Sequence, residues 1–123
     1  MVKLNTTSIR GAITLKENNE KEIIISTKEL LLEIENKNNL NRENVISILF
    51  SSTKDLTAEY PAKAARLLGY TQCGLMCFNE MEVVGSINKC IRVMVLYQGS
   101  LEQRNVKHIY LRDAKTLRPD LNK

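Results

Sequence analysis

A chain of 123 residues with 43% hydrophobic side chains is long enough to form one domain with its own core, without disulfides. Its net charge of +4 indicates a mild attraction to anions, but scattered basic residues and only two Phe and four Tyr do not make the face of a nucleic-acid-binding protein. Three cysteines and one histidine argue against a disulfide framework or a zinc site, and no apolar run reaches the roughly 18 residues of a membrane span, so we expect a soluble cytoplasmic protein.

The first expected strand covers residues 7–15, where β-branched residues occur at both odd and even positions. Arg10 lies inside this apolar run, and Gly11 and Ala12 beside it leave room for a second backbone or a ligand to approach. An arginine at this place either belongs to a binding site or points to solvent from an edge strand. The residues alone leave both interpretations open.

A helix is expected from about residue 20 to residue 37. Asn19 with Glu22 three residues later matches the start of a capping box, and the asparagines of residues 36–39 favour the left-handed conformation that ends a helix. One helical face carries the residues expected to enter the core, which are Ile23, Thr27, Leu30, Leu31 and Ile34.

A buried strand over residues 45–50 and a short helix over residues 61–68 are expected next. The strand is an apolar run followed by a polar loop, which is typical of a core strand. Pro61 suits the first turn of the helix, because its missing N–H is not needed there, and Gly69 suits the position just after it.

A third apolar strand is expected over residues 74–78, and Glu80 follows it directly. Side chains in loops at strand ends often form binding sites. Glu80 is therefore a candidate site residue, with a solvated loop acid as the alternative.

The central strand is expected over residues 89–98, where Gly85 and Gly99 bound a run of large apolar residues. Such a strand is predicted to be covered on both faces, with Arg92 as the one charge inside it. Strand alternation divides these residues between two faces. One face carries Cys90, Arg92, Met94 and Leu96, and the other carries Ile91, Val93, Val95 and Tyr97. An unpaired buried charge costs several kcal/mol, so Arg92 needs a carboxylate partner, an external anion or a route to water.

A fifth strand is expected over residues 107–111, with His108 and Tyr110 on one face. No nucleophile and acid are spaced around His108, so it is interpreted as a surface or hydrogen-bonded histidine. Residues 113–123 are polar and interrupted by Pro119, and they are expected to form a loosely held tail of the single domain, residues 1–123.

Six short motifs along the chain together resemble one enzyme family. They are Ile9-Arg10-Gly11-Ala12, Tyr60-Pro61-Ala62-Lys63-Ala64-x-Arg66, Cys77-x-x-Glu80-Met81, Lys89-Cys90-Ile91-Arg92-Val93-Met94, His108-x-Tyr110-Leu111 and Leu117-Arg118-Pro119-Asp120-Leu121. In order and spacing they are similar to the monofunctional chorismate mutases of the Bacillus type. The pair Leu75-Met76 stands where a smaller, more polar pair is expected.

This resemblance implies an α+β fold in which a mixed sheet packs with two helices and three chains form a pseudo-α/β-barrel. It implies an isomerase of the shikimate pathway, which converts chorismate to prephenate for phenylalanine and tyrosine biosynthesis, with each site between two subunits. The implied substrate-binding residues are Arg10, Tyr60, Ala62, Lys63, Arg66, Leu75, Met76, Cys77, Glu80, Arg92, Tyr110, Leu117 and Arg118.

The implied reaction is an intramolecular Claisen rearrangement, which needs no nucleophile, metal or cofactor. Arg92 is expected to stabilise the negative charge that grows on the ether oxygen, Glu80 to accept a hydrogen bond from the ring hydroxyl, and Arg10 to hold a carboxylate. Two other functions stay open on the residues themselves. One is a trimeric protein on the same fold that binds small carboxylates without turnover, and the other is nucleic-acid binding.

Overall fold

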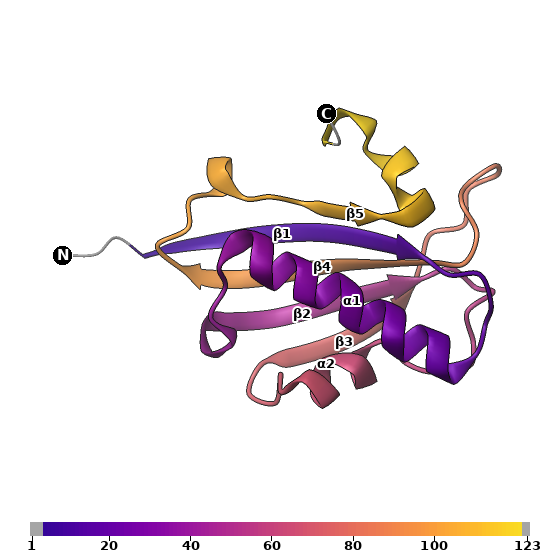
Figure 1. Cartoon of the computed structure of the whole chain (residues 1–123), viewed down its shortest axis with the longest axis horizontal. Helices are drawn as coiled ribbons and strands as arrows, with labels where there is room; N and C mark the ends of the chain where they lie inside the picture. The colour runs from indigo at the N-terminus through magenta and orange to yellow at the C-terminus, as the bar shows by residue number, and fades with distance from the viewer. Residues whose placement is uncertain (1–3, 122–123) are drawn as a thin grey trace.

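The computed structural model describes residues 4–121, which form a five-stranded mixed sheet with two helices on it (Figure 1). The strand order is β3-β2-β4-β1-β5, so β4 is central, as predicted. β4 pairs antiparallel with β1 and β2, whereas β5 on β1 and β3 on β2 are parallel. The strands are β1 (Asn5–Thr14), β2 (Val45–Ser52), β3 (Gly74–Asn79), β4 (Cys90–Gly99) and β5 (Ile109–Leu111).

Both helices, α1 (Glu20–Asn38) and α2 (Ala62–Leu68), pack on the same face of the sheet (Figure 1). The predicted apolar face of α1 is buried in full, and it contacts the alternate residues of β1 and β4 that point toward it. No helix in residues 4–121 is long and apolar enough to cross a membrane. The predicted α+β class is therefore correct.

The ends of α1 follow the local sequence. Asn19 caps the helix, since its side-chain oxygen accepts a hydrogen bond of 2.7 Å from the Glu22 N–H. The Glu22 carboxylate does not return to Asn19 and instead accepts from the Lys16 N–H at 2.8 Å, so the capping box is only half formed. Asn39 ends the helix with φ of 51°, in the left-handed conformation expected of an asparagine there.

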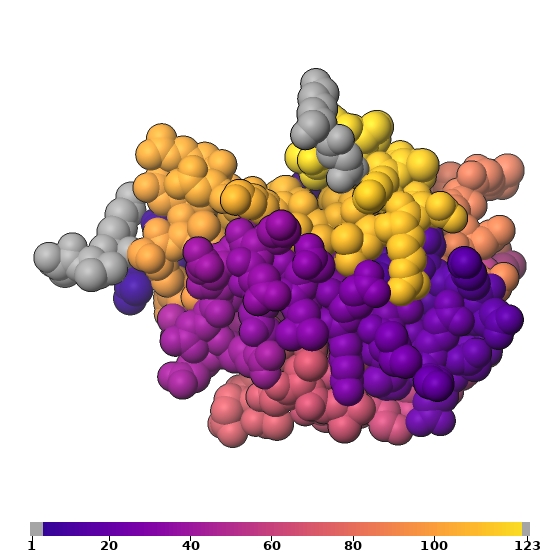
Figure 2. Space-filling view, in the orientation of Figure 1, coloured from indigo at the N-terminus to yellow at the C-terminus, as the bar shows by residue number. Residues whose placement is uncertain are grey.

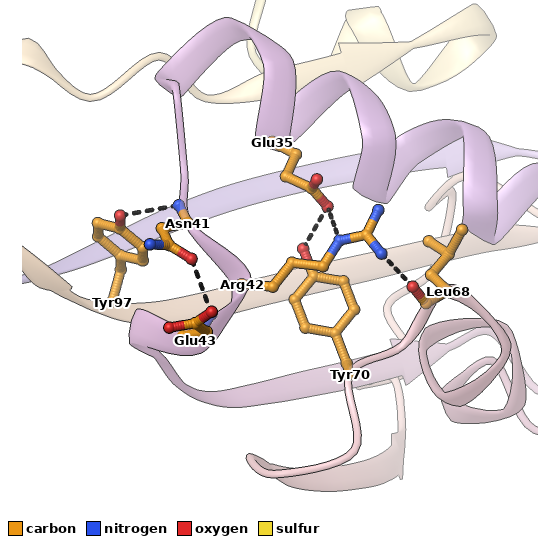
Figure 3. Close-up of polar contacts among 7 residues, drawn as sticks. All are labelled: Glu35, Asn41, Arg42, Glu43, Leu68, Tyr70 and Tyr97. Carbon is orange, nitrogen blue, oxygen red and sulfur yellow. Dashed lines mark hydrogen bonds and ion pairs between the residues drawn. The ribbon is translucent and has the colours of Figure 1, made fainter.

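The two helices are tied together by a polar cluster of Glu35, Arg42 and Tyr70 (Figure 3). Glu35 Oε2 accepts from Arg42 Nε at 2.9 Å and from the Tyr70 hydroxyl at 2.6 Å. Arg42 also donates to the carbonyl of Leu68, at the last turn of α2, and Gly69 then ends α2 with φ of 107°. Burial, followed by the bond to Glu35, raises the pKa of Tyr70, so its hydroxyl remains a donor.

β4 is predicted to be covered on both faces, and within a single chain only one face is covered. Ile91, Val93, Val95 and Tyr97 are buried under the helices, but Arg92, Met94 and Leu96 on the other face are half-exposed. Because both helices lie on one side of the sheet, the second face is covered only near Cys90, where Ala114 of the C-terminal segment packs. We call this second side of the sheet the open face.

The backbone of β5 lies close against β1 at Gly11. A Cβ atom at position 11 would lie 2.7 Å from the carbonyl oxygen of Ile109 and 3.0 and 3.1 Å from side-chain carbons of Ile34 and Leu30. The space that was predicted beside Arg10, at Gly11, is thus occupied by the backbone of β5. Because β5 pairs along β1, the interpretation of Arg10 as an edge-strand residue is wrong.

After β5 the chain makes two short 3-10 helices, η3 (Arg112–Leu117) and η4 (Pro119–Leu121). The C-terminal segment forms the upper edge of the molecule in the view of Figure 2. Arg112 Nη1 donates to the Thr14 carbonyl at 2.9 Å, which fastens η3 to the end of β1. Residues 122 and 123 of the predicted tail lie outside the described residues, and the loose hold of the tail stays a prediction.

Candidate active site

A pocket of about 260 Å³ opens on the open face of the sheet, over β4, β1 and β2. Its lining includes Arg10 from β1, Arg92 and Met94 from β4, Tyr110 from β5, and Ser51 and Phe78 from β2 and β3. Strand alternation and register bring these side chains together, since Arg92 pairs with Ala12 on one side and with Ser51 on the other. The small Ala12 leaves space between the two arginines.

Arg92 has a carboxylate beside it and still faces the pocket. Its Nε lies 3.3 Å from Glu80 Oε2, and 43% of its side chain is exposed against 24% for Glu80. Glu80 Oε2 also accepts from the Ser51 hydroxyl at 2.5 Å, and the Glu80 N–H donates to the Ser52 carbonyl at 2.9 Å. Glu80 is therefore held in place beside Arg92, and the alternative of a solvated loop acid is wrong.

The guanidinium of Arg92 is only partly neutralised by this pairing. Its Nε atom is buried and has no hydrogen bond of good geometry among the described residues, and Glu80 is shared with Ser51. Cys90 lies two residues away on the same face, and burial raises the pKa of its thiol to about 11, so no thiolate competes for Arg92. A partly buried arginine with spare donors is suited to an anion.

The phenol of Tyr110 and the C-terminal residues Leu117 and Arg118 meet at the β5 side of the pocket. Tyr110 is buried in a small cluster with Ala12, against which Leu117 packs. Arg118 contacts Asp120 at 2.9 Å, and the hydrogen bond to this carboxylate raises the pKa of Arg118. Arg10, Arg92 and Tyr110 thus line one pocket, with Glu80 beside Arg92. Leu117 and Arg118 lie near Tyr110.

The remaining predicted residues, except Met76, form a second group on the side of β3 that faces α2. Cys77 pairs with the buried Phe50, so its side chain points toward α2, where Tyr60, Pro61 and Cys77 line a separate hollow of about 500 Å³. Ala62, Lys63, Arg66 and Leu75 belong to this side as well. The expectation that Cys77 lies at the same end of one pocket as Glu80 is not met within a single chain.

Lys63 belongs to this second group, whereas Met76 does not. Lys63 contacts Glu20 and Glu59 at 3.0 Å each, and hydrogen bonds first to Glu59 and then to Glu20 raise its pKa. Met76 lies on the open face, because it alternates with Leu75 along β3. Burial raises the pKa of Cys77, so its thiol is protonated at neutral pH.

Ser51, Phe78 and Met94 line the pocket and were not predicted as site residues. The alternation of β4 places Met94 on the face of Arg92, so the sequence signal for it was present. Ser51 and Phe78 depend on the pairing of β2 with β3 and β4, which no local pattern shows. No three His, Cys, Asp or Glu side chains in the described part of the chain lie close enough to hold a metal ion.

Two arginines, a carboxylate and a phenol around a small, partly apolar pocket define a site for a small anionic molecule on an α+β scaffold. Residues 6–121 match the family model described as chorismate mutase type I. The chain belongs to this family.

Named relatives agree over nearly the whole chain. The chain is 44% identical over 115 residues to chorismate mutase AroH of Bacillus subtilis strain 168, which covers 93% of this chain and 91% of that protein. It is 41% identical over 114 residues to chorismate mutase AroH of Thermus thermophilus, with 92% and 93% covered. A solved chorismate mutase of Clostridium thermocellum superimposes with a TM-score of 0.87 at 47% identity, over 89% of this chain and 97% of that one.

Proposed function

We propose that the pocket between Arg10 and Arg92 is where this chorismate mutase converts chorismate to prephenate. The observation that carries this proposal is the pair of half-buried arginines on one sheet face, with Glu80 fixed 3.3 Å from Arg92. Chorismate is a dianion with a flexible enolpyruvyl arm, and its rearrangement breaks an ether C–O bond while a C–C bond forms in the same molecule. Such a reaction requires orientation and charge stabilisation.

Arg10 and Tyr110 hold the carboxylate of the enolpyruvyl arm in this proposal. They come from neighbouring strands and line the same side of the pocket. A guanidinium and a phenol can bind one carboxylate through charge-assisted hydrogen bonds. Holding the arm restricts the substrate to the chair-like conformer in which the two reacting carbons meet, and this lowers the entropic part of the barrier.

Arg92 acts on the ether oxygen, which gains negative charge only as its bond to carbon opens. A donor that is already aimed at that oxygen stabilises the transition state more than the substrate, which raises kcat. Glu80 keeps Arg92 in place from one side and accepts a hydrogen bond from the ring hydroxyl of the substrate. Ser51 in turn fixes the Glu80 carboxylate at 2.5 Å.

The site is completed by a second copy of the chain, and the protein assembles as a homotrimer. Supporting this is the division of the proposed residues into two groups, on the open face and on the α2 side of β3, which one chain does not bring together. The open face also exposes Met76 and Phe78 beside the half-exposed Met94. Contact between the α2 side of one chain and the open face of the next would unite both groups and bury these apolar residues.

The assembly is tested by measuring mass in solution with light scattering. The expected mass is about three times the 14.0 kDa of one chain. Phe78→Glu, at a side chain 47% exposed on the open face, is expected to reduce this mass, because a carboxylate would be buried in the interface. Ile25→Glu, at a side chain 51% exposed on α1, is the matched control and should leave the mass unchanged. A fully active monomer would contradict the shared site.

Lys63 is expected to capture the substrate at the mouth of the site without taking part in the chemistry. Lys63→Ala should therefore raise KM several-fold with kcat nearly unchanged, because attraction of the dianion acts equally before and in the transition state. Lys37→Ala removes the same charge from the far end of α1 and is the control. Steady-state kinetics at low ionic strength separate the two parameters, and a fall in kcat alone would rule out the capture role.

The activity itself is tested by mixing the protein with chorismate and following the loss of the diene absorbance of the substrate. The proposed site is supported if the parent turns over chorismate and variants of Arg10 and Arg92 do not. A folded trimer that binds chorismate without turnover would instead be a small-carboxylate-binding protein. We also place the enzyme in the cytoplasm, which suits the three unpaired cysteines, of which Cys73 and Cys77 are partly exposed.

A further inference from the structure

In the first half of β1, the backbone N–H groups that face β5 donate to side chains and not to backbone carbonyls. Backbone pairing with β5 starts only at Gly11, opposite Ile109. Before that point the Ser8 N–H donates to the side-chain oxygen of Gln103 at 2.8 Å, and the Arg10 N–H donates to His108 Nδ1 at 2.9 Å. The imidazole of His108 thus takes the place of a strand carbonyl beside Arg10.

The backbone next to His108 is held by the end of α1. The side-chain amide of Asn38, buried at the last turn of α1, donates to the Lys107 carbonyl at 2.9 Å and accepts from the Lys107 N–H at 2.8 Å. Asn38 also donates to the carbonyl of Ile34 at 3.0 Å. The backbone of the residue before His108 is therefore fixed to α1 by two hydrogen bonds.

We infer that His108 is a positioning residue that fixes the backbone of Arg10 and so the direction of its guanidinium in the pocket. The inference rests on the proposed role of Arg10 in holding a substrate carboxylate. Arg10 has β4 on one side and, through His108, β5 on the other. Loss of the second contact would free its N–H, and a misplacement of about 1 Å in a site can lower the rate by up to about 10²-fold.

The surroundings of His108 keep it in the form that this contact needs. Nδ1 accepts the hydrogen bond, so the proton of the neutral ring is on Nε2. Burial first, and then the positive charges of Arg10 and Arg118, lower the pKa of His108, while Asp120 faces those arginines from η4. A protonated ring could not accept from Arg10 and would add a third positive charge there.

Two substitutions at His108 distinguish loss of the hydrogen-bond acceptor from loss of the imidazole ring. His108→Leu removes the acceptor, whereas His108→Asn keeps one, because its Oδ1 is as many bonds from Cα as Nδ1 of histidine. We expect kcat/KM to fall roughly tenfold in the leucine variant and to stay within about twofold of the parent in the asparagine variant. Equal values for the two variants would overturn the inference. If the leucine variant does not fold, His108→Gln replaces it, since its acceptor lies one bond further out.

A double-mutant cycle with Arg10→Ala tests whether His108 acts through Arg10. In the Arg10→Ala background, His108→Leu is expected to change kcat/KM by less than about twofold, since the guanidinium to be positioned is absent. The same loss in both backgrounds would show a purely structural role and overturn the inference. The cycle is also measured as chorismate affinity by calorimetry. A parent that binds but does not turn over would refute the proposed activity, while the affinities would still decide the role of His108.

Discussion

Arg92→Lys is expected to lower kcat by at least about 10²–10³-fold, the usual effect of losing one preorganised donor to a developing oxyanion. Lysine keeps the charge but loses the planar fork, so it cannot contact Glu80 and aim a second donor at the ether oxygen together. The ion pair with Glu80, 3.3 Å in the parent, would hold the shorter ammonium away from the substrate. Because the contact strengthens only as the ether bond opens, KM should change less than kcat.

The control for this prediction is Arg104→Lys, at an exposed arginine that pairs with Glu102 and belongs to neither group of proposed site residues. The exchange keeps the charge at a place that is not proposed to contact the substrate, so this variant should stay within a few-fold of the parent. Rapid-mixing kinetics and solution mass should be measured on both variants. An Arg92→Lys protein that is assembled like the parent and turns over within a few-fold of it would remove Arg92 from the mechanism.

Gly11→Ala is expected to destabilise the fold by about 1–3 kcal/mol, in the range of overpacked cores. The added carbon would lie 2.7 Å from a backbone oxygen of β5, and the side chains of Leu30 and Ile34 behind it are fully buried. Relief requires β5 to move away from β1, which would shift Tyr110 in the pocket. A loss of kcat/KM should therefore accompany the loss of stability.

Gly74→Ala, in β3, is the matched control, because its added carbon would lie 3.8 Å from Ser47 Cβ, an ordinary contact. Alanine lowers the conformational entropy of the unfolded chain, so this variant should be neutral or more stable by up to about 1 kcal/mol. Melting temperatures are to be compared at one protein concentration, since assembly couples to stability. Equal melting temperatures for Gly11→Ala and the parent would contradict the close packing at β1.

The sequence by itself determined the elements and the family. The caps of α1 at Asn19 and Asn39, the turn residues Pro61 and Gly69 and the apolar run of β4 all act through neighbours in the chain, so their patterns predict structure locally. The motifs around Arg92 and Arg118 carried the resemblance that the family model bears out over residues 6–121. Alternation also showed which β4 residues share a face with Arg92.

Only the tertiary structure decided which face of the sheet is covered. Alternation divides β4 into two faces, but the side on which α1 and α2 pack is set by contacts distant in sequence, so Arg92 was expected in a dry strand and is half-exposed. The same distant contacts place Cys77 on the side opposite Arg92 and bring Glu80 and Ser51 to it. His108 had no local signal, because its partner, the Arg10 N–H, is 98 residues away and lies in β1.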